Sequence, residues 1–491
     1  MIVDAIREVT NIYDIMAICC VYLLNEIEST GYSIWDYDEN SNDDIFDMIE
    51  RYNSNIKERG HKISLRILVK ELEKELCDKG ITPDILWAIV SNIDRMVTTD
   101  IGGNKLFSSA TIYEYQTLNN CARNEIRIIP KINDSLLLKD GEYILKDPKN
   151  NNHNLFRNRT ECYCSWIDEA TVNYMVWDKE KIDKYPFTIY HVANNSDIAK
   201  HYRDRRKIRI GIVPFSADDL KDILDIEFQN RTFHIAGMKE ESQELLKNRY
   251  VEAYKKTIDK DVDFLIYPEM LMTETIIKAI DSEIENTENG PIFVVNGSIW
   301  KDKTNKSIVT DNMGNQIFTY FKKCAFNYAE DGKEYREDLD CTRNKEYMIL
   351  EIDNIGRIGV CICKDIRDPE VALFHQYIDT DILLVPAFSS SLVLVSNARN
   401  MAENFNCITV FANSCSACSK KWKECDSYNI GFITMPAKNG TENSCCAENY
   451  GAEECHTTCN EKCSVKVFTL TFDEIKMYDD KISIQLESSS I

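Results

Sequence analysis

Cys363 stands where an apolar stretch of the sequence gives way to charged and turn-forming residues. Ahead of it, Ile358, Val360 and Ile362 alternate with smaller residues, which predicts a buried strand. A thiol at the end of such a strand is firmly held and reachable, so it could act as a nucleophile beside a base and an oxyanion donor. The alternative is that Cys363 is one more small buried side chain, because the chain contains 19 cysteines.

Two other predicted strands end in residues that would complete such a site. Residues 264–270 form an apolar run that delivers Glu269 directly after a proline, and the β-prone run 318–323 ends in Lys322 and Lys323. A carboxylate can take the thiol proton and pass it to a leaving amine, while an ammonium group stabilises charge on the attacked carbonyl oxygen. Charged residues end many strands, but Glu, Lys and Cys together are what thiol-based amide hydrolysis requires.

The segment from about residue 206 to residue 474 resembles a carbon–nitrogen hydrolase of the nitrilase superfamily. The matching stretches in chain order are an opening strand (208–215), a Tyr-Pro-Glu segment (267–269), a Tyr-x-Lys segment (320–322), a nucleophile strand (359–365), an apolar run (384–387), a helix similar to the family's Arg-Ala-x-Glu-Asn (398–404), and a strand that ends in Asn413 (410–413).

The resemblance implies the roles of individual residues. Glu269, Lys322 and Cys363 take the positions of the catalytic triad, and Lys322 is preferred to Lys323 because it keeps the family spacing from the tyrosine. The resemblance also implies a second glutamate shortly after the lysine, which positions the substrate; Glu330 is the first choice for it and Glu334 the reserve. The backbone N–H of Lys364 would serve the oxyanion, Cys361 falls at a variable position, and the triad requires no cofactor.

The fold that the resemblance implies is a four-layer α-β-β-α sandwich, in which two sheets pack face to face under helices. The alternation of strand and helix patterns along the chain agrees with it. The predicted strands begin near residues 208, 264 and 382, and the predicted helices cover 240–260, 369–379 and 396–405. Family members typically associate through this core, so the resemblance also implies a homo-oligomer.

Composition sets the outer limits of the interpretation. At 491 residues the chain is long enough for several domains, and it contains no apolar stretch of membrane-spanning length and no leader pattern. Abundant cysteines in such a chain predict a reducing cytoplasm and free thiols or metal ligands. The net charge of −23 argues against a general nucleic-acid or anionic membrane partner. The basic stretch 200–209 is interpreted as a solvated linker.

The residues ahead of the hydrolase-like segment show no family match and divide into two parts. Residues 1–100 predict a helical region, with helices over 3–28, 65–79 and 82–97. Residues 101–205 predict a small mixed α/β module with the basic linker, and strands at 110–113, 126–129 and 187–190. The predicted hydrolase domain then covers 206–480. The front region is expected to regulate, recruit or oligomerise it.

A cysteine-rich region predicts a structural metal site. Cys415 and Cys418 are separated by two residues and Cys459 and Cys463 by three, and further cysteines and His456 lie between the two pairs. Such spacings can hold one zinc ion. The strands expected at 431–434 and 467–470 would be neighbours, with 439–464 as an insertion that zinc orders. The alternative is a loop of free thiols, and no catalytic role is expected for zinc.

Two classes of function remain at this point. The first is a hydrolase of a non-peptide carbon–nitrogen bond in a small molecule (an amide, a nitrile or a carbamoyl group), which works through a Glu-Lys-Cys triad and a cysteine thioester. The second is a catalytically silent scaffold or ligand-binding regulatory module, for example in stress or phage defence. The presence of all three triad residues favours the enzyme, because a scaffold needs none of them.

Overall fold

The computed structural model describes most of the chain. The described residues are 2–30, 43–95, 112–115, 119, 122, 124–130, 174–192, 196–198, 201, 207–214, 220–330, 332–352, 355–389, 393–405, 407–414, 429–436, 445–451, 465–472 and 484–490. The chain divides into two compact units, of which the first comprises Met1–Ser109, Tyr115–Asn133 and Glu161–Pro186, and the second the remainder. No helix in the described part of the chain has the length and apolar character to cross a bilayer.

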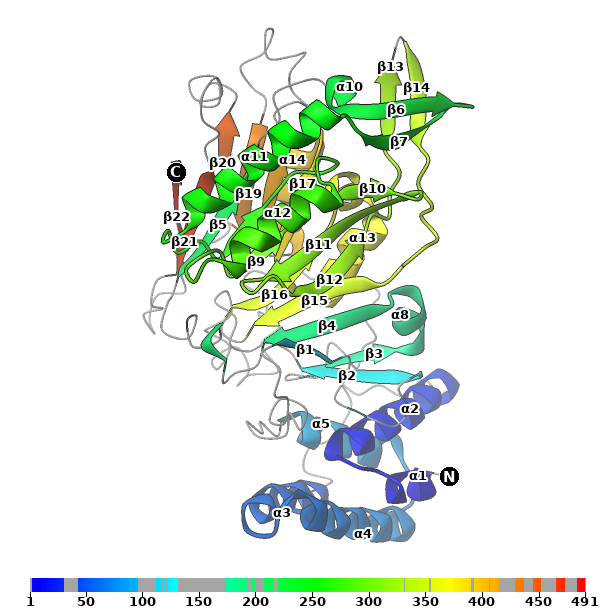
Figure 1. The fold of residues 1–491 in the computed structure, drawn as a ribbon. Helices are drawn as coiled ribbons and strands as arrows, with labels where there is room; N and C mark the ends of the chain where they lie inside the picture. Colours follow the sequence, from blue (N-terminus) through cyan, green and yellow to red (C-terminus); the bar gives the residue numbers. More distant parts are fainter. Residues whose placement is uncertain are drawn as a thin grey trace. The chain divides into compact units, whose positions relative to one another are not determined.

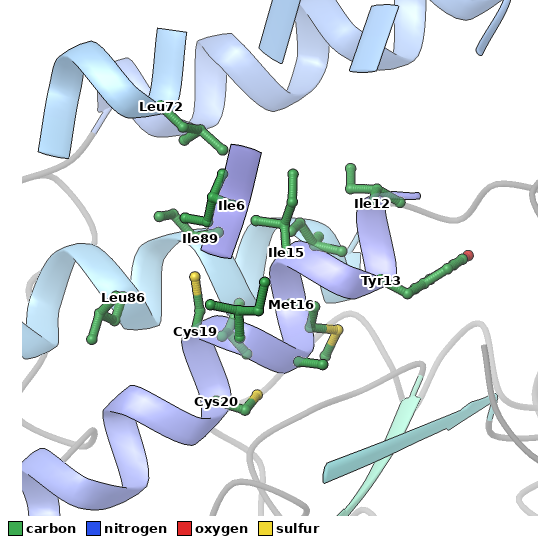
Figure 2. Packing of buried hydrophobic residues seen from close by; sticks show 14 of the residues in the cluster. Ile6, Ile12, Tyr13, Ile15, Met16, Cys19, Cys20, Leu72, Leu86 and Ile89 are labelled. Atoms are coloured by element: carbon green, nitrogen blue, oxygen red, sulfur yellow. The ribbon is translucent and has the colours of Figure 1, made fainter. Parts of the chain in front are cut away.

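The first unit is built mainly from helices, as the sequence predicts. The helices are α1 (Ile2–Arg7), α2 (Ile12–Thr30), α3 (Asp43–Arg59), α4 (His61–Lys79) and α5 (Pro83–Arg95). Apolar side chains at helical spacing on α2, α4 and α5 meet in one buried cluster, and Figure 2 shows Ile15, Met16 and Cys19 of α2 within it. Side chains of that size contribute roughly 1.5–3 kcal/mol each when fully buried.

The predicted helix over 3–28 is wrong in one respect, because the structure divides it into α1 and α2. The reason is a capping box at the start of α2: the Asn11 side chain accepts a hydrogen bond of 2.9 Å from the Asp14 backbone N–H, and the Asp14 carboxylate accepts one of 3.1 Å from the Asn11 N–H. Asp14 also accepts from the backbone N–H and the hydroxyl of Thr10. These bonds satisfy the first turn of α2 and end the preceding helix.

A pair of antiparallel strands completes the first unit. The strands β2 (Ile126–Pro130) and β3 (Tyr174–Asp178) are antiparallel, and helix α8 (Lys179–Lys184) follows directly. The Tyr174 hydroxyl lies 2.8 Å from the Tyr13 hydroxyl, so β3 is bonded to α2.

The second unit contains two eight-stranded sheets and a four-stranded sheet (Figure 1). The first sheet has the order β1 (Ile112–Tyr115), β4 (Phe187–Val192), β15 (Tyr347–Ile352), β16 (Gly356–Val360), β17 (Thr380–Ala387), β18 (Ile408–Asn413), β19 (Asn429–Pro436) and β20 (Cys445–Gly451). The second has the order β10 (Ile299–Lys301), β11 (Thr304–Asp311), β9 (Phe293–Val295), β8 (Phe264–Ile266), β5 (Lys207–Ile212), β21 (Lys466–Phe472) and β22 (Ile484–Ser490), with β12 (Gln316–Phe321) also paired to β11. The four-stranded sheet has the order β13 (Asn327–Glu330), β14 (Lys333–Glu337), β7 (Thr232–Met238) and β6 (Leu224–Gln229).

Helices pack on both eight-stranded sheets. The helices α11 (Glu240–Thr257) and α12 (Glu274–Glu285) pack side by side and share a buried cluster with residues of β8 and β9 (Figure 1). The helices α13 (Pro369–Tyr377) and α14 (Val393–Phe405) pack on strands of the first sheet, and the short α10 (Leu220–Ile223) precedes β6. The predicted helices at 240–260, 369–379 and 396–405 are confirmed.

The two eight-stranded sheets contact each other through side chains. The ring of Tyr190 on β4 lies 5.5 Å from the ring of Phe318 on β12, centroid to centroid. A Cβ added at Gly431 of β19 would lie 2.0 Å from the Cδ1 atom of Ile212 on β5, so this contact leaves no room for a side chain. The ends of strands from the two sheets therefore meet in one interior.

Two predictions about the end of the chain can be compared with the sheet topology. The strands predicted at 431–434 and 467–470 are not neighbours, because β19 lies in the first sheet and β21 in the second. Within the expected insertion 439–464, residues 445–451 form β20, which pairs with β19. The cysteines at 415–425 and 455–463 lie outside the described residues, so the zinc site stays a prediction. The domain boundaries also stay predictions, although β4 pairs with β15 and so belongs to the second unit.

Candidate active site

The nucleophile candidate sits in a strained turn at the end of a buried strand. β16 is buried throughout, and Cys363 opens the 3₁₀ turn η3 (Cys363–Arg367) with a φ of +48°. That left-handed conformation is unusual for any residue except glycine and costs of order 1–3 kcal/mol. The thiol is buried and donates a hydrogen bond of 3.9 Å to the Phe388 carbonyl oxygen. Cys363 therefore lies at the transition from strand to turn, where the sequence predicts it.

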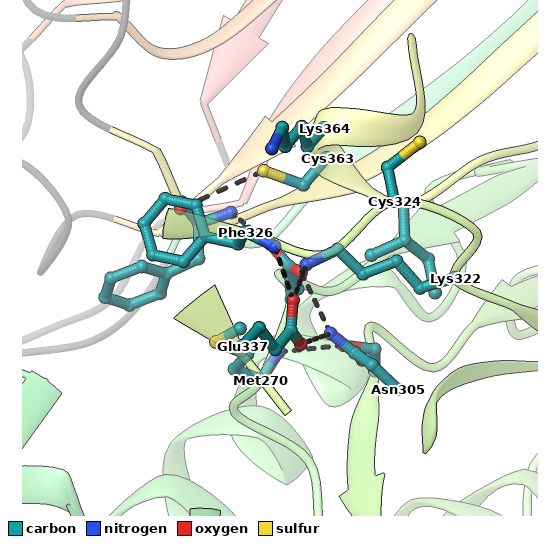
Figure 3. A network of polar contacts seen from close by, with 12 residues as sticks. Met270, Asn305, Lys322, Cys324, Phe326, Glu337, Cys363 and Lys364 are labelled. Atoms are coloured by element: carbon teal, nitrogen blue, oxygen red, sulfur yellow. Dashed lines mark hydrogen bonds and ion pairs between the residues drawn. The ribbon is translucent and has the colours of Figure 1, made fainter. Parts of the chain in front are cut away.

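Lys322 lies between two carboxylates at the end of β12. Its Nζ atom is 2.7 Å from Oε1 of Glu269 and 2.7 Å from Oε2 of Glu337, and all three side chains are buried (Figure 3). Burial alone would lower the pKa of Lys322, but the two neighbouring carboxylates outweigh it and raise that pKa well above its ordinary value. The ammonium is therefore held in its charged form.

Glu269 is fixed by donors from several elements. Its Oε1 also accepts from the Asn305 side-chain amide at 3.0 Å, and its Oε2 accepts from the Phe388 N–H at 3.0 Å. The loop that carries it is tightly packed, since a Cβ added at Gly297, where φ is +43°, would lie 2.1 Å from the Pro268 carbonyl oxygen. Glu269 therefore has little freedom to move away from Lys322.

The thiol and the carboxylate interact and have perturbed pKa values. The charge of Glu269 acts on the Cys363 thiol, which donates its hydrogen bond to the Phe388 carbonyl oxygen. Burial raises the pKa of Glu269, against the opposing effect of Lys322, and burial together with the Glu269 charge raises the pKa of Cys363 well above its ordinary value. The resting thiol is consequently protonated, and the carboxylate beside it is a stronger base than a solvated one.

The carboxylate that joins Lys322 from outside the triad is Glu337, which is neither of the two glutamates chosen from the sequence, and the substrate-positioning role of Glu330 or Glu334 stays a prediction. Glu330 lies on β13 opposite Lys333, and Glu334 is exposed on β14. Glu337 ends β14, and the Phe326 N–H donates to its Oε2 at 2.9 Å. The strands β13 and β14 form a hairpin after Lys322, and Glu337 ends its second strand. The glutamate that contacts Lys322 therefore comes 15 positions after the lysine and not eight.

Lys323 points to different partners. Its Nζ donates to the Lys345 and Glu346 carbonyl oxygens at 2.8 and 3.1 Å, and lies 4.1 Å from the centroid of the Tyr347 ring. Burial lowers its pKa to about 8. The structure therefore brings Lys322, and not its neighbour, to Glu269.

Asp365 joins the lysine segment to the cysteine turn. Its carboxylate accepts hydrogen bonds from the Tyr320 hydroxyl at 3.0 Å, from the backbone N–H groups of Lys323 and Cys324 at 3.0 and 2.8 Å, and from that of Ile362 at 3.3 Å. These donors come from the ends of β12 and β16, which belong to different sheets. Sequence reasoning missed this role. The sequence feature that could have indicated it is an acidic residue two positions after the nucleophile, at the end of an apolar run.

The loop after β17 is held from the next strand. The Asn413 side chain at the end of β18 accepts from the Ser389 N–H at 2.9 Å and donates to the Ser389 carbonyl at 2.7 Å. This clamp positions the adjacent Phe388, whose backbone contacts both Glu269 and Cys363. Lys364 extends its Nζ to the Ala325 carbonyl at 2.7 Å, across to the lysine segment.

Known proteins resemble this chain at the level of structure. No protein-family model matches the sequence, and no curated protein matches it. Solved structures of nitrilase superfamily members match about half of the chain. *Saccharomyces cerevisiae* Nit3, a member of branch 10 of that superfamily, is 15% identical, with 51% of this chain and 92% of Nit3 covered and a TM-score of 0.33.

Two further structures show the same extent of likeness. The *C. elegans* NitFhit protein is 16% identical over 51% of this chain and 62% of its own, with a TM-score of 0.35. An amidase from Nesterenkonia sp. is 13% identical, with 51% of this chain and 95% of the amidase covered and a TM-score of 0.31.

Proposed function

We propose that this protein hydrolyses a non-peptide carbon–nitrogen bond of a small molecule through a covalent cysteine intermediate. The observation that carries the proposal is the buried arrangement of Glu269, Lys322 and Cys363. The Lys322 ammonium lies 2.7 Å from the Glu269 carboxylate, whose charge acts on the Cys363 thiol. An amide is the leading substrate class, with nitriles and carbamoyl compounds as variants of the same chemistry.

The first half of the reaction forms a thioester. The Cys363 thiol transfers its proton to Glu269 as Sγ attacks the carbonyl carbon, and the Lys322 ammonium stabilises the oxygen that becomes negative. The Lys364 backbone N–H is the second proposed donor to that oxygen. Glu269 then gives its proton to the nitrogen, the carbon–nitrogen bond breaks, and the amine or ammonia leaves.

The second half returns the enzyme to its starting state. Glu269, again a carboxylate, takes a proton from water as the water oxygen attacks the thioester carbon. The carbon–sulfur bond breaks, the acid leaves, and the proton returns to Cys363. Glu337 supports both halves because it keeps Lys322 protonated while Glu269 gains and loses its charge.

Further features of the protein belong to the same proposal. We expect the second unit to form the four-layer α-β-β-α sandwich of the nitrilase fold, to associate into a homo-oligomer in the cytoplasm, and to need no cofactor for catalysis. The described residues contain no cluster of metal-ligating side chains. A structural zinc at 415–463 is proposed separately; elemental analysis of protein purified without chelator should find about one zinc per chain.

Thiol labelling together with substrate discovery tests the proposed function. Both thiols are buried, but Cys363 has Glu269 nearby to take its proton, so iodoacetamide should label Cys363 faster than Cys361 at neutral pH, as measured by mass spectrometry of the two peptides. In a metabolite extract, the wild type should consume a compound that Cys363→Ala leaves intact. The control is Cys361→Ala, which should keep the activity and lose stability, because Cys361 is a core residue.

Two results would contradict the proposal. Slow labelling of Cys363, with no metabolite consumed, would favour the silent scaffold. Equal loss of activity in Cys361→Ala and Cys363→Ala, accompanied by unfolding of both, would show that Cys363 is a core residue and not a nucleophile.

A further inference from the structure

Three segments of the active site meet at Asn305 on β11. The Asn305 side-chain amide donates to Oε1 of Glu269 at 3.0 Å and to Oε1 of Glu337 at 3.4 Å, and its backbone carbonyl accepts from the Lys322 N–H at 2.8 Å. The side chain is fully buried. Figure 3 shows its nitrogen directed at the carboxylates. No other residue in the described part of the chain is hydrogen-bonded to Glu269, Glu337 and Lys322 together.

The charges around Asn305 explain why a donor is needed there. Glu269 and Glu337 carry two negative charges against one positive charge on Lys322, and the three side chains are at most 2% exposed. Two carboxylates that share one buried site cannot both stay ionised without further stabilisation. Backbone N–H groups supply one bond to each, from Phe388 to Glu269 and from Phe326 to Glu337. The Asn305 amide adds a bond to both.

The orientation of the amide follows from chemistry. A carboxylate only accepts hydrogen bonds, so the NH₂ group and not the carbonyl oxygen must face the two glutamates. The Asn305 Oδ1 atom consequently points away, and it has no hydrogen-bond partner among the described residues.

We propose that Asn305 is a positioning residue that holds Glu269 and Glu337 together as carboxylates against Lys322. Its neutral NH₂ group lets the two like charges share one ammonium while Glu269 remains free to receive the Cys363 proton. The proposal rests on the function proposed above for Cys363 and Glu269. It adds a fifth residue to that site, from a strand that carries no reacting group.

The experiment measures how the reactivity of Cys363 depends on pH, with iodoacetamide as the probe. Asn305→Asp preserves the shape of the side chain but replaces the donor by an acceptor or a third negative charge. The midpoint of the pH profile of Cys363 alkylation should move upward by on the order of one pH unit, which is about tenfold slower labelling below the midpoint. Asn305→Ala, which only removes the donor, should shift it upward by less.

Asn296 provides the matched control. It has the same side chain, is equally buried at the end of a strand in the same sheet, and its amide donates only to the Thr310 hydroxyl, at 3.4 Å. Asn296→Ala should lower the melting temperature about as much as Asn305→Ala and leave the alkylation midpoint at the wild-type value.

The outcomes separate this inference from the proposed function. A wild type in which Cys363 is not selectively labelled ends the proposed function and this inference with it. Selective labelling of the wild type, with unchanged midpoints in folded Asn305→Asp and Asn305→Ala, ends only the role of Asn305. If Asn305→Asp fails to fold, the midpoint of Asn305→Ala decides alone.

Discussion

The Tyr320 hydroxyl donates a hydrogen bond of 3.0 Å to Oδ2 of Asp365, and both side chains are fully buried. Tyr320 lies two residues before Lys322, and Asp365 two residues after Cys363. The bond therefore fixes the distance between lysine and nucleophile, which come from strands of different sheets.

Asp365→Asn should separate the two halves of the site. The Asn side chain would turn an NH₂ group toward N–H donors that need an acceptor, and an unsatisfied buried donor costs about 1–3 kcal/mol. The variant should have a lower melting temperature than the wild type, and iodoacetamide should no longer label Cys363 selectively. Full retention of that selectivity would show that the hydrogen bond between Tyr320 and Asp365 does not position the thiol.

Lys322→Ala should slow turnover by on the order of a hundredfold or more, by analogy with the loss of one oxyanion donor. Binding should suffer less, because the interaction strengthens as charge builds on the carbonyl oxygen. Single-turnover rates on the metabolite consumed by the wild type would measure this. Lys323→Ala is the control: it should keep the chemistry and lose stability, since its ammonium holds carbonyl groups and a tyrosine ring. The opposite pattern would place the reacting lysine one residue later.

Glu337→Gln should reduce turnover on the order of a hundredfold, the cost of misplacing a catalytic group by about 1 Å. The reason is that Lys322 would keep one carboxylate in place of two. Glu334→Gln, an exposed position on the same strand, should be close to wild type, and Glu330→Gln tests the sequence-based choice directly. Greater loss in Glu330→Gln than in Glu337→Gln would overturn the assignment of Glu337.

His375→Gln should make the first eight-stranded sheet less sensitive to acid. Burial, with a contribution from the Lys323 charge, lowers the pKa of His375 from 6.5 to about 3. Between pH 6.5 and about pH 3, His375 binds a proton in the unfolded state but not in the folded state. The free energy of unfolding therefore decreases as the pH falls below 6.5. At pH 5 the loss from this group is about 2 kcal/mol.

Hydrogen exchange of peptides from β16 and α13, at pH 7.5 and pH 5, measures that effect. Between the two pH values the wild type should lose more protection than His375→Gln. Equal losses would mean that His375 is protonated in the folded state.

Local patterns in the sequence were enough to find the residues at strand ends. Apolar runs that stop at Glu269, Lys322 and Cys363 reflect how strands leave a buried sheet, and the structure brings those three residues together. The same patterns predicted α4, α5, α11, α13 and α14. They failed at Asn11 and Asp14, where side-chain bonds to the backbone interrupt an apolar periodicity that continues through the break.

Contacts that depend on the path of the chain could not be predicted in this way. The choice of Glu330 assumed a short loop after Lys322, whereas a hairpin around Gly332 returns the chain at Glu337. Asn305 looked like an ordinary polar residue of a strand, because its partners lie 32 and 36 positions away. Which sheets β19 and β21 join is likewise a matter of long-range pairing.

The left-handed backbone at Cys363 has a consequence for how this chain would change if its chemistry were lost. Glycine adopts a φ of +48° without penalty, so glycine at this position would relieve the backbone strain that cysteine bears. A sequence that drifted under a requirement for folding alone would replace Cys363 early, whereas one that must attack a carbonyl has to keep it. The side chain is thus retained against the preference of its own backbone, as in enzymes whose active sites trade stability for activity.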